Sequence, residues 1–237
     1  MLIVISSKDT TTRVRHAGPP LGIVATIFVL LFIAGLYPVT AFGGKPVFPG
    51  PGESLDVILA FFQTRASAVL LCAALQFGAA IPLGIFTAAI VSRLRFLGVR
   101  AAGTEIAFFG GLATALNMMA SSSVLWTMSY PGIAQEPALL QALYRLTFAL
   151  GGPGFSVPFG LLIAGVSVTA GFNKLLPKWI VIPGLVIAVI GELSWLDILF
   201  PKMLFLIPLT RFPGFVWLIA AGFALPKTVD RERHEQK

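Results

Sequence analysis

Six long apolar stretches, joined by short polar connections, constrain this chain more than any other feature of its sequence. Each stretch approaches the about 20 residues that a helix needs to cross the ~30 Å hydrocarbon core of a bilayer. Membrane-spanning strands are shorter and alternate apolar with polar residues, a pattern that the sequence lacks. We therefore expect six helical spans, over residues 21–42, 66–91, 102–128, 155–172, 179–199 and 203–225.

The composition agrees with an all-α, multi-pass membrane protein. Hydrophobic residues make up 57% of the 237 residues and charged residues only 11%, whereas soluble domains carry about 25% charged residues. So apolar a chain cannot hide its hydrophobic side chains in one core, and much of its surface must face the lipid bilayer. The net charge of +7 does not indicate a nucleic-acid partner, because the basic residues gather at the borders of the spans.

Lys and Arg residues are concentrated in every second connection. The basic residues before span one, between spans two and three, between spans four and five, and after span six are Lys8, Arg13, Arg15, Arg93, Arg95, Arg100, Lys174, Lys178, Lys227, Arg231, Arg233 and Lys237. Cytoplasmic connections are enriched in Lys and Arg, so both termini are predicted to be cytoplasmic. The chain then divides into a cytoplasmic segment (1–20), a six-span domain (21–226) and a tail (227–237) whose last residues, 230–237, we expect to be frayed and solvated.

The first span has an alternative interpretation. A basic lead-in, an apolar run and small residues near Thr40 to Gly43 also fit a signal peptide. The lead-in is long and the run is almost of span length, which favours an uncleaved first span. Cleavage would leave five spans and would not change the orientation of the rest.

Two outer connections have structure of their own. Residues 43–52 contain three prolines and four glycines and cannot form a helix, whereas 53–62 read as a short helix that lies in the outer interface or extends span two. Residues 138–150 form an apolar helical segment that is either interfacial or re-entrant. The Gly-Gly-Pro-Gly sequence at 151–154 is expected to break or kink the helix.

Ionisable residues within or beside the spans are the first candidates for a functional site, because charge inside a membrane costs free energy. Six such residues fall in the outer half of the predicted membrane: Arg65, Arg145, Glu192, Asp197, Lys202 and Arg211. If they converge, they form an outward-facing pocket with a positive net charge, suited to a small anionic or amphipathic ligand. Arg211 lies about 13 Å below Lys202 along a helix and needs a partner, for which Glu192 is the first choice.

A structural interpretation stands beside this one. Arg65 and Lys202 can extend to the outer interface, and Glu192 with Arg211 can simply tie span five to span six. Small residues four apart, such as Gly84 and Ala88, permit close helix packing within the chain or with another copy or a partner subunit. The same pattern occurs at Gly160 and Ala164 and at Ala220 and Ala224.

Span three carries a separate polar set. Asn117 and Ser121 are four residues apart and share a helix face, and Gln76 of span two could face them. We interpret them as interhelical hydrogen-bonding residues, with a polar translocation path as the alternative. Glu105 is predicted to pair with Arg93, Arg95 or Arg100, or to interact with the N-terminus of its own helix.

Other sequence motifs, present or absent, restrict the kinds of site that the chain can form. Pro208 and Pro213 flank Arg211, which predicts an irregular segment over 206–215 that lines a cavity. Cys72 is interpreted as a small apolar filler. The sequence has no Walker or Rossmann glycine pattern and no zinc-type Cys and His spacing, so we predict no cofactor, metal or catalytic residue.

The C-terminal part carries a resemblance. Residues 191–194 (GELS), 208–218 (PLTRFPGFVWL) and 222–226 (GFALP) are similar to an uncharacterised family of bacterial multi-pass membrane proteins, a domain of unknown function. The resemblance implies several helical spans in a bacterial inner membrane and supplies no activity.

Three functions are compatible with these observations. The first is a small-solute or lipid binding or transport protein with its pocket around Arg211, Glu192 and Arg145. The second is a structural or accessory membrane subunit that packs against partner helices. The third is a lipid-modifying enzyme with Glu192 or Asp197 as acid or base, which we rank below the other two.

Overall fold

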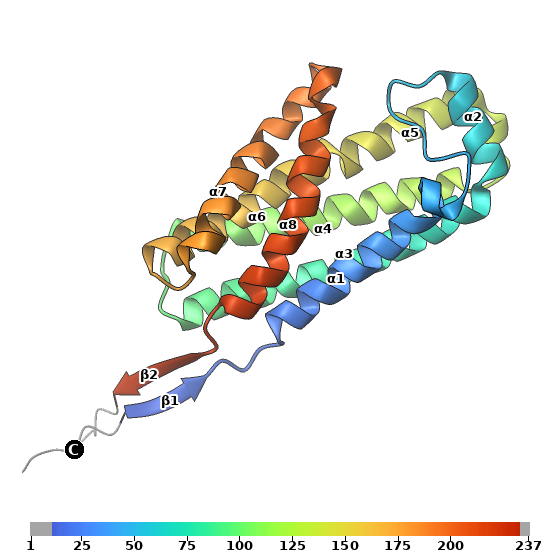
Figure 1. Ribbon diagram of the computed structural model, residues 1–237. Helices are drawn as coiled ribbons and strands as arrows, with labels where there is room; N and C mark the ends of the chain where they lie inside the picture. Colours follow the sequence, from blue (N-terminus) through green and yellow to red (C-terminus); the bar gives the residue numbers. More distant parts are fainter. Residues whose placement is uncertain (1–10, 233–237) are drawn as a thin grey trace, which may run out of the picture.

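The computed structural model describes residues 11–232 and has the all-α architecture that the sequence predicts. Its helices pack side by side into an elongated bundle (Figure 1). Six apolar helical segments of this part of the chain are long enough to cross a bilayer: Leu21–Val39, Ala66–Phe96, Ala102–Met128, Pro137–Phe172, Lys178–Ile198 and Pro201–Ala224. The helices are α1 (Leu21–Leu36), α2 (Leu55–Thr64), α3 (Ala66–Phe96), α4 (Ala102–Met128), α5 (Pro137–Gly151), α6 (Pro153–Phe172), α7 (Lys178–Leu193) and α8 (Leu206–Ala224).

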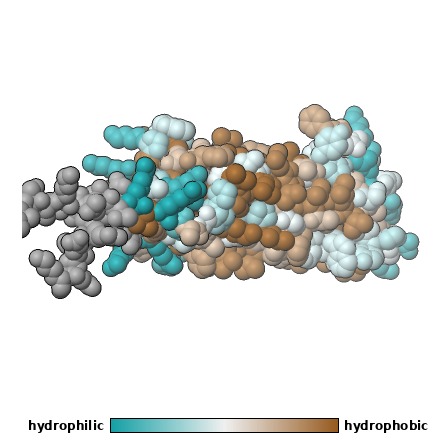
Figure 2. All heavy atoms as spheres, turned by 90° about the horizontal axis from the view of Figure 1, so that it is seen from below, coloured by the Kyte–Doolittle hydropathy of each residue, from teal (hydrophilic) through white to brown (hydrophobic). Residues whose placement is uncertain are grey.

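The surface supports the membrane assignment. Figure 2 shows an apolar belt between two polar ends. Large aliphatic side chains of the belt are exposed, among them Leu30, Leu116, Val189 and Val216. A helix that is apolar on all sides needs lipid or protein around its whole circumference. The exposed side chains are therefore placed to contact the hydrocarbon core.

Glycines set the closest helix contacts. A Cβ built on Gly165 of α6 would collide with the backbone of Gly103 and Ala107 of α4, and one on Gly160 would lie 3.0 Å from the Ala188 carbonyl oxygen of α7. Close backbone approach of this kind drives helix association where water does not. The spacing of small residues thus correctly predicts a close helix contact at Gly160. It does not predict the surroundings of Gly84, where a Cβ atom would meet nothing within 4 Å.

The Gly-Gly-Pro-Gly sequence breaks the helix as predicted. α5 ends at Gly151, Gly152 is non-helical, and α6 begins at Pro153. α5 nevertheless runs on along the bundle, beside α4, and also contacts α2 (Figure 1). It therefore has neither the surface-lying nor the re-entrant arrangement considered from the sequence. The short helix predicted over 53–62 is present as α2.

The prediction of an irregular segment over 206–215 is wrong. α8 is a continuous α-helix from Leu206 to Ala224. Pro208 lies in its first turn, where a backbone N–H has no helical acceptor in any case, and Pro213 is accommodated in the helix interior. The irregular part comes earlier, as two short 3-10 helices, Ser194–Ile198 and Pro201–Phe205.

Residues 230–232, which we expected to be frayed, belong to a strand, whereas the rest of that tail, 233–237, lies outside the described residues. β2 (Thr228–Glu232) pairs antiparallel with β1 (Thr11–Arg15), in a register that places Val14 opposite Val229. Both ends of the described chain therefore lie at one end of the bundle, as an even number of spans requires (Figure 1). Of the residues discussed from the sequence, Lys8, Arg233 and Lys237 lie outside the described residues.

The end of the bundle that carries the β1–β2 ribbon is the basic end. Its basic residues are Arg13, Arg15, Arg93, Arg95, Arg100, Lys174, Lys178, Lys227 and Arg231, and they outnumber its acidic residues Glu105, Asp230 and Glu232. The opposite end has a mixture of signs, with Lys45, Arg65, Arg145 and Lys202 beside Glu53, Asp56, Glu136 and Asp197. We call these the ribbon end and the distal end.

Substituting Gly165 tests the helix packing. Gly165→Val inserts a side chain against the α4 backbone, and overpacking of this kind costs about 1–3 kcal/mol. We expect a clearly lower Tm for the purified protein in detergent. Gly84→Val is the matched control, because a Cβ atom there meets nothing within 4 Å, and it should stay close to the wild type. Equal Tm values for the two variants would contradict the packing described.

Candidate ligand cavity

A large apolar cavity occupies the distal half of the bundle. Its volume is about 850 Å³, and it lies among α1, α3, α4, α5, α8 and the connection that follows α1. The walls are formed mainly by hydrophobic side chains, including Phe32, Leu36, Met118, Leu125 and Phe155. Small-molecule sites are typically apolar cavities of about 300–1,000 Å³ with a few placed polar groups. The cavity therefore has the size and the lining of a ligand site.

The cavity exists because α8 diverges from α1. At the ribbon end the two helices touch, since a Cβ on Gly222 would lie 2.8 Å from the backbone nitrogen of Gly22. Further along, Phe28 and Phe32 pack on Phe215, with ring centroids 5.2 Å and 4.7 Å apart. Beyond these rings the helices separate toward the distal end (Figure 1). The space between them is the cavity, with Arg211 lining it.

Arg211 is held in this cavity without a carboxylate. Its Nη2 donates a hydrogen bond to the Gly151 carbonyl oxygen, and its guanidinium carbon lies 4.7 Å from the centroid of the Phe155 ring and 5.4 Å from that of Phe32. Cation–π contacts of this type contribute roughly 0.5–2 kcal/mol. The Nε atom is buried and has no hydrogen-bond partner. Within residues 11–232 the guanidinium thus retains free donors and an uncompensated charge.

Neutral polar groups complete the lining. Gln76 donates to the Phe32 carbonyl oxygen at 3.1 Å, and Ser121 donates to the Thr147 carbonyl oxygen at 3.0 Å. Tyr144 donates to the Pro49 carbonyl oxygen at 2.9 Å. These bonds tie α3 to α1, α4 to α5, and α5 to the connection after α1. Ser122 also lines the cavity.

Asn117 lies next to this set and has a structural role. Its Nδ2 donates to the Gly154 carbonyl oxygen at 2.6 Å. Pro158 has no N–H, so it cannot supply the helical hydrogen bond that the Gly154 carbonyl would otherwise accept. Asn117 replaces that donor from α4. The interpretation of Asn117 and Ser121 as interhelical hydrogen-bonding residues is confirmed.

The structure does not bring the six predicted ionisable residues together. Only Arg211 lines the cavity. Glu192 turns toward α6, where a Cβ on Gly160 would lie 3.1 Å from its Oε1. It forms no ion pair with Arg211, and the pair expected from the sequence is therefore absent from the described residues. The cause is the helix rotation, because α7 presents Glu192 to its neighbour α6.

The other ionisable candidates lie outside the cavity. Arg145 and Lys202 are exposed, and the Asp197 Oδ1 is buried without a hydrogen-bond partner. Arg65 binds the connection after α1, donating to the carbonyl oxygens of Pro38 at 2.7 Å and Gly43 at 2.9 Å. It therefore supports one cavity wall from behind.

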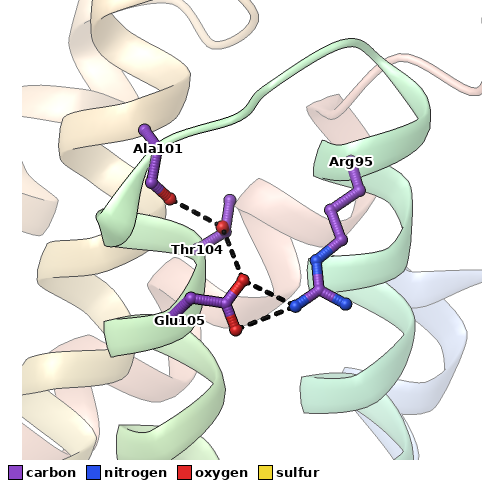
Figure 3. Close-up of polar contacts among 4 residues, drawn as sticks. All are labelled: Arg95, Ala101, Thr104 and Glu105. Atoms are coloured by element: carbon purple, nitrogen blue, oxygen red, sulfur yellow. Dashed lines mark hydrogen bonds and ion pairs between the residues drawn. The ribbon is translucent and has the colours of Figure 1, made fainter.

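Glu105 lies at the opposite, ribbon end and pairs with Arg95, one of the three partners predicted. Figure 3 shows both carboxylate oxygens facing the Arg95 Nη2, at 2.6 Å and 2.8 Å. Thr104 donates to the Ala101 carbonyl oxygen at 2.7 Å in the same group. The side chains of Arg95 and Glu105 are 55% and 62% exposed, so solvent screening leaves this pair little weight in stability. It is remote from the cavity.

Two further residues at the ribbon end hold the segment before α1. Arg93 is 2% exposed and donates to the Pro19 carbonyl oxygen at 3.0 Å. The His16 ring lies 3.1 Å from the Ser92 hydroxyl. Burial and the nearby Arg93 charge lower the pKa of His16. These contacts fix the ribbon on the bundle rather than form a site.

Sequence reasoning missed several cavity residues. Phe32, Phe155 and Phe205 look like ordinary lipid-facing or core aromatics in an apolar sequence, and Thr147 lies in a segment whose placement was open. Cys72 also lines the cavity while 4% exposed. The spacing of Phe155 just after the Gly-Gly-Pro-Gly break was the one available signal, since a broken helix end often borders a cavity.

Comparison with protein-family models, with curated proteins and with solved structures found no match. The resemblance of residues 191–226 to an uncharacterised bacterial family therefore stays a prediction.

Arg65 provides a test of the cavity wall. Arg65→Ala removes two charge-assisted hydrogen bonds to the 38–43 segment, and each is worth about 1.5–3 kcal/mol in a favourable setting. We expect cleavage by subtilisin within 38–52 to become several-fold faster. Lys45→Ala, which removes an exposed cation from the same connection, is the control and should leave the cleavage rate unchanged. Unaltered cleavage of both variants would show that Arg65 does not hold the wall.

Proposed function

We propose that this chain is a binding or transport protein of the bacterial inner membrane that takes an amphipathic ligand into the distal cavity from the outer side. The observation that carries this proposal is the apolar cavity of about 850 Å³ with Arg211 in its wall. The apolar surface accommodates hydrocarbon, and Arg211 orients the polar part of the ligand. Both termini are cytoplasmic in this proposal.

The cavity favours binding over the two other functions. A structural subunit would pair Arg211 with a carboxylate, whereas here Arg211 lines the cavity and its buried Nε has no hydrogen-bond partner. An acid–base enzyme would bring Glu192 or Asp197 to the cavity, but no Asp, Glu or His lines it within the described part of the chain. The lining thus provides a charge anchor without a proton-transfer pair.

The charge distribution supports the proposed orientation. The basic residues gather at the ribbon end, and the cavity lies toward the distal end, where acidic and basic residues are mixed. Cytoplasmic borders of membrane proteins are enriched in Lys and Arg. The ribbon end is then cytoplasmic, and the cavity opens on the outer side.

Filling the cavity tests the binding function. Ser122→Leu adds volume inside the cavity, so hexadecanol, a neutral amphiphile, should bind at least tenfold more weakly than to the wild type. The measurement is equilibrium binding of radiolabelled hexadecanol to the protein in nanodiscs. Ser123→Leu, one position along α4 on the exposed surface, is the control and should retain wild-type affinity. The same affinity in all three proteins would contradict binding in this cavity.

Cysteine labelling tests the orientation. In a Cys72→Ala background, Gln135→Cys places a thiol at the distal end and Ala101→Cys places one at the ribbon end, both at exposed positions. A membrane-impermeant maleimide should label Gln135→Cys in intact bacterial cells. Ala101→Cys should be labelled only after lysis. The reverse pattern would overturn the proposed orientation.

A further inference from the structure

The cavity has a definite charge, which restricts what it can hold. Arg211 is the one charged side chain in its lining among residues 11–232, and the remaining polar groups are neutral amides, hydroxyls and the Cys72 thiol. An isolated charge in apolar surroundings is costly unless it is paired and hydrogen-bonded. One positive charge is matched by one negative charge, so the electrostatics of the cavity favour a monoanion.

Arg211 is positioned in advance for an anion. The Gly151 carbonyl oxygen, at the C-terminus of α5, accepts from Nη2, and the negative end of a helix dipole favours a cation there. Phe32 and Phe155 lie against the guanidinium. Since a guanidinium has five N–H donors in a fixed fork, the bond to Gly151 leaves donors for a second acceptor. The side chain does not have to be reoriented when a ligand binds.

We propose that the occupant is a single-charged, long-chain carboxylate, with its carboxylate on Arg211 and its hydrocarbon chain along the apolar walls. This inference rests on the proposed function and names the class of ligand for the same cavity. A carboxylate matches the guanidinium fork with two parallel hydrogen bonds. The hydrocarbon is required because a small water-soluble anion would leave walls such as Leu36, Leu125 and Phe205 without contacts.

The same arrangement disfavours other head groups. A phosphate monoester carries about −1.5 to −2 charges at neutral pH, and its second charge would meet only neutral groups. A quaternary ammonium would repel Arg211 in a medium that screens charge poorly. A fatty alcohol fills the apolar space but leaves the guanidinium unpaired. The predicted order of affinity is carboxylate first, alcohol second, and phosphate monoester no better than the alcohol.

The experiment compares three probes of equal chain length on the full chain in nanodiscs at pH 8: hexadecanoate, hexadecanol and hexadecyl phosphate. Equilibrium binding of the radiolabelled compounds is measured for the wild type, Arg211→Met, Arg211→Lys and Lys202→Met. Arg211→Met removes the charge and keeps apolar bulk, and Arg211→Lys keeps the charge but not the fork. Lys202→Met removes an exposed cation just before α8 and is the matched control.

We expect the wild type and Lys202→Met to bind hexadecanoate at least tenfold more tightly than hexadecanol. Arg211→Met should lose this preference and keep its affinity for hexadecanol. Arg211→Lys should show an intermediate preference, and it also serves as the test if Arg211→Met does not fold, as judged by gel filtration and circular dichroism.

The outcomes separate this inference from the proposed function. Equal wild-type affinities for hexadecanoate and hexadecanol, with both weakened by Ser122→Leu, would overturn the carboxylate assignment and leave the binding cavity in place. Tightest binding of hexadecyl phosphate would replace the ligand class. A carboxylate preference that persists in both Arg211 variants would remove Arg211 as the anchor. Absence of binding by every probe would overturn the inference and the proposed function together.

Discussion

A partly buried arginine that binds the end of a broken helix links the other features of this protein. The Gly-Gly-Pro-Gly sequence ends α5 at Gly151 and starts α6 at Pro153, and a helix end leaves carbonyl groups without helical donors. Water that could satisfy them is scarce within a membrane, so side chains must do so. Arg211 donates to the Gly151 carbonyl at this break. Asn117 donates to the Gly154 carbonyl inside α6, which Pro158 leaves without a helical donor. The helix break thus supplies a hydrogen-bond acceptor for the arginine, and the arginine supplies a donor for the free carbonyl group at the break.

This compensation explains why an arginine is tolerated so deep in the bundle. The carbonyl oxygen and the two phenyl rings lower the cost of burying the charge without neutralising it, as a carboxylate would. Glu192 and Arg211 come from adjacent helices, yet α7 is rotated so that Glu192 contacts α6. What remains is a positive charge with free donors beside an apolar cavity. We regard that residual charge as the functional part of the arrangement.

The sequence predicts the architecture well and the cavity poorly, for a physical reason. Span length and the Gly-Gly-Pro-Gly sequence are properties of single segments, so the spans and the break at 151–154 follow from them directly. Which face of a helix meets which neighbour depends on packing that residue types do not determine.

Arg211 was identifiable because a deep charge is costly wherever it points. By residue type alone, Glu192, Arg145 and Lys202 were equally plausible as cavity residues. They do not line the cavity because their helical segments turn them elsewhere. The β1–β2 ribbon was missed because a polar end has no local signal that distinguishes pairing from fraying.

The most direct test of this account is an experimental density map of the chain in a lipid nanodisc prepared with hexadecanoate. We expect an elongated density in the distal cavity, with its polar end at the Arg211 guanidinium and the Gly151 contact preserved. A collapsed cavity with Arg211 turned onto Glu192 would contradict it, and the polar residues of spans five and six would then be structural ties.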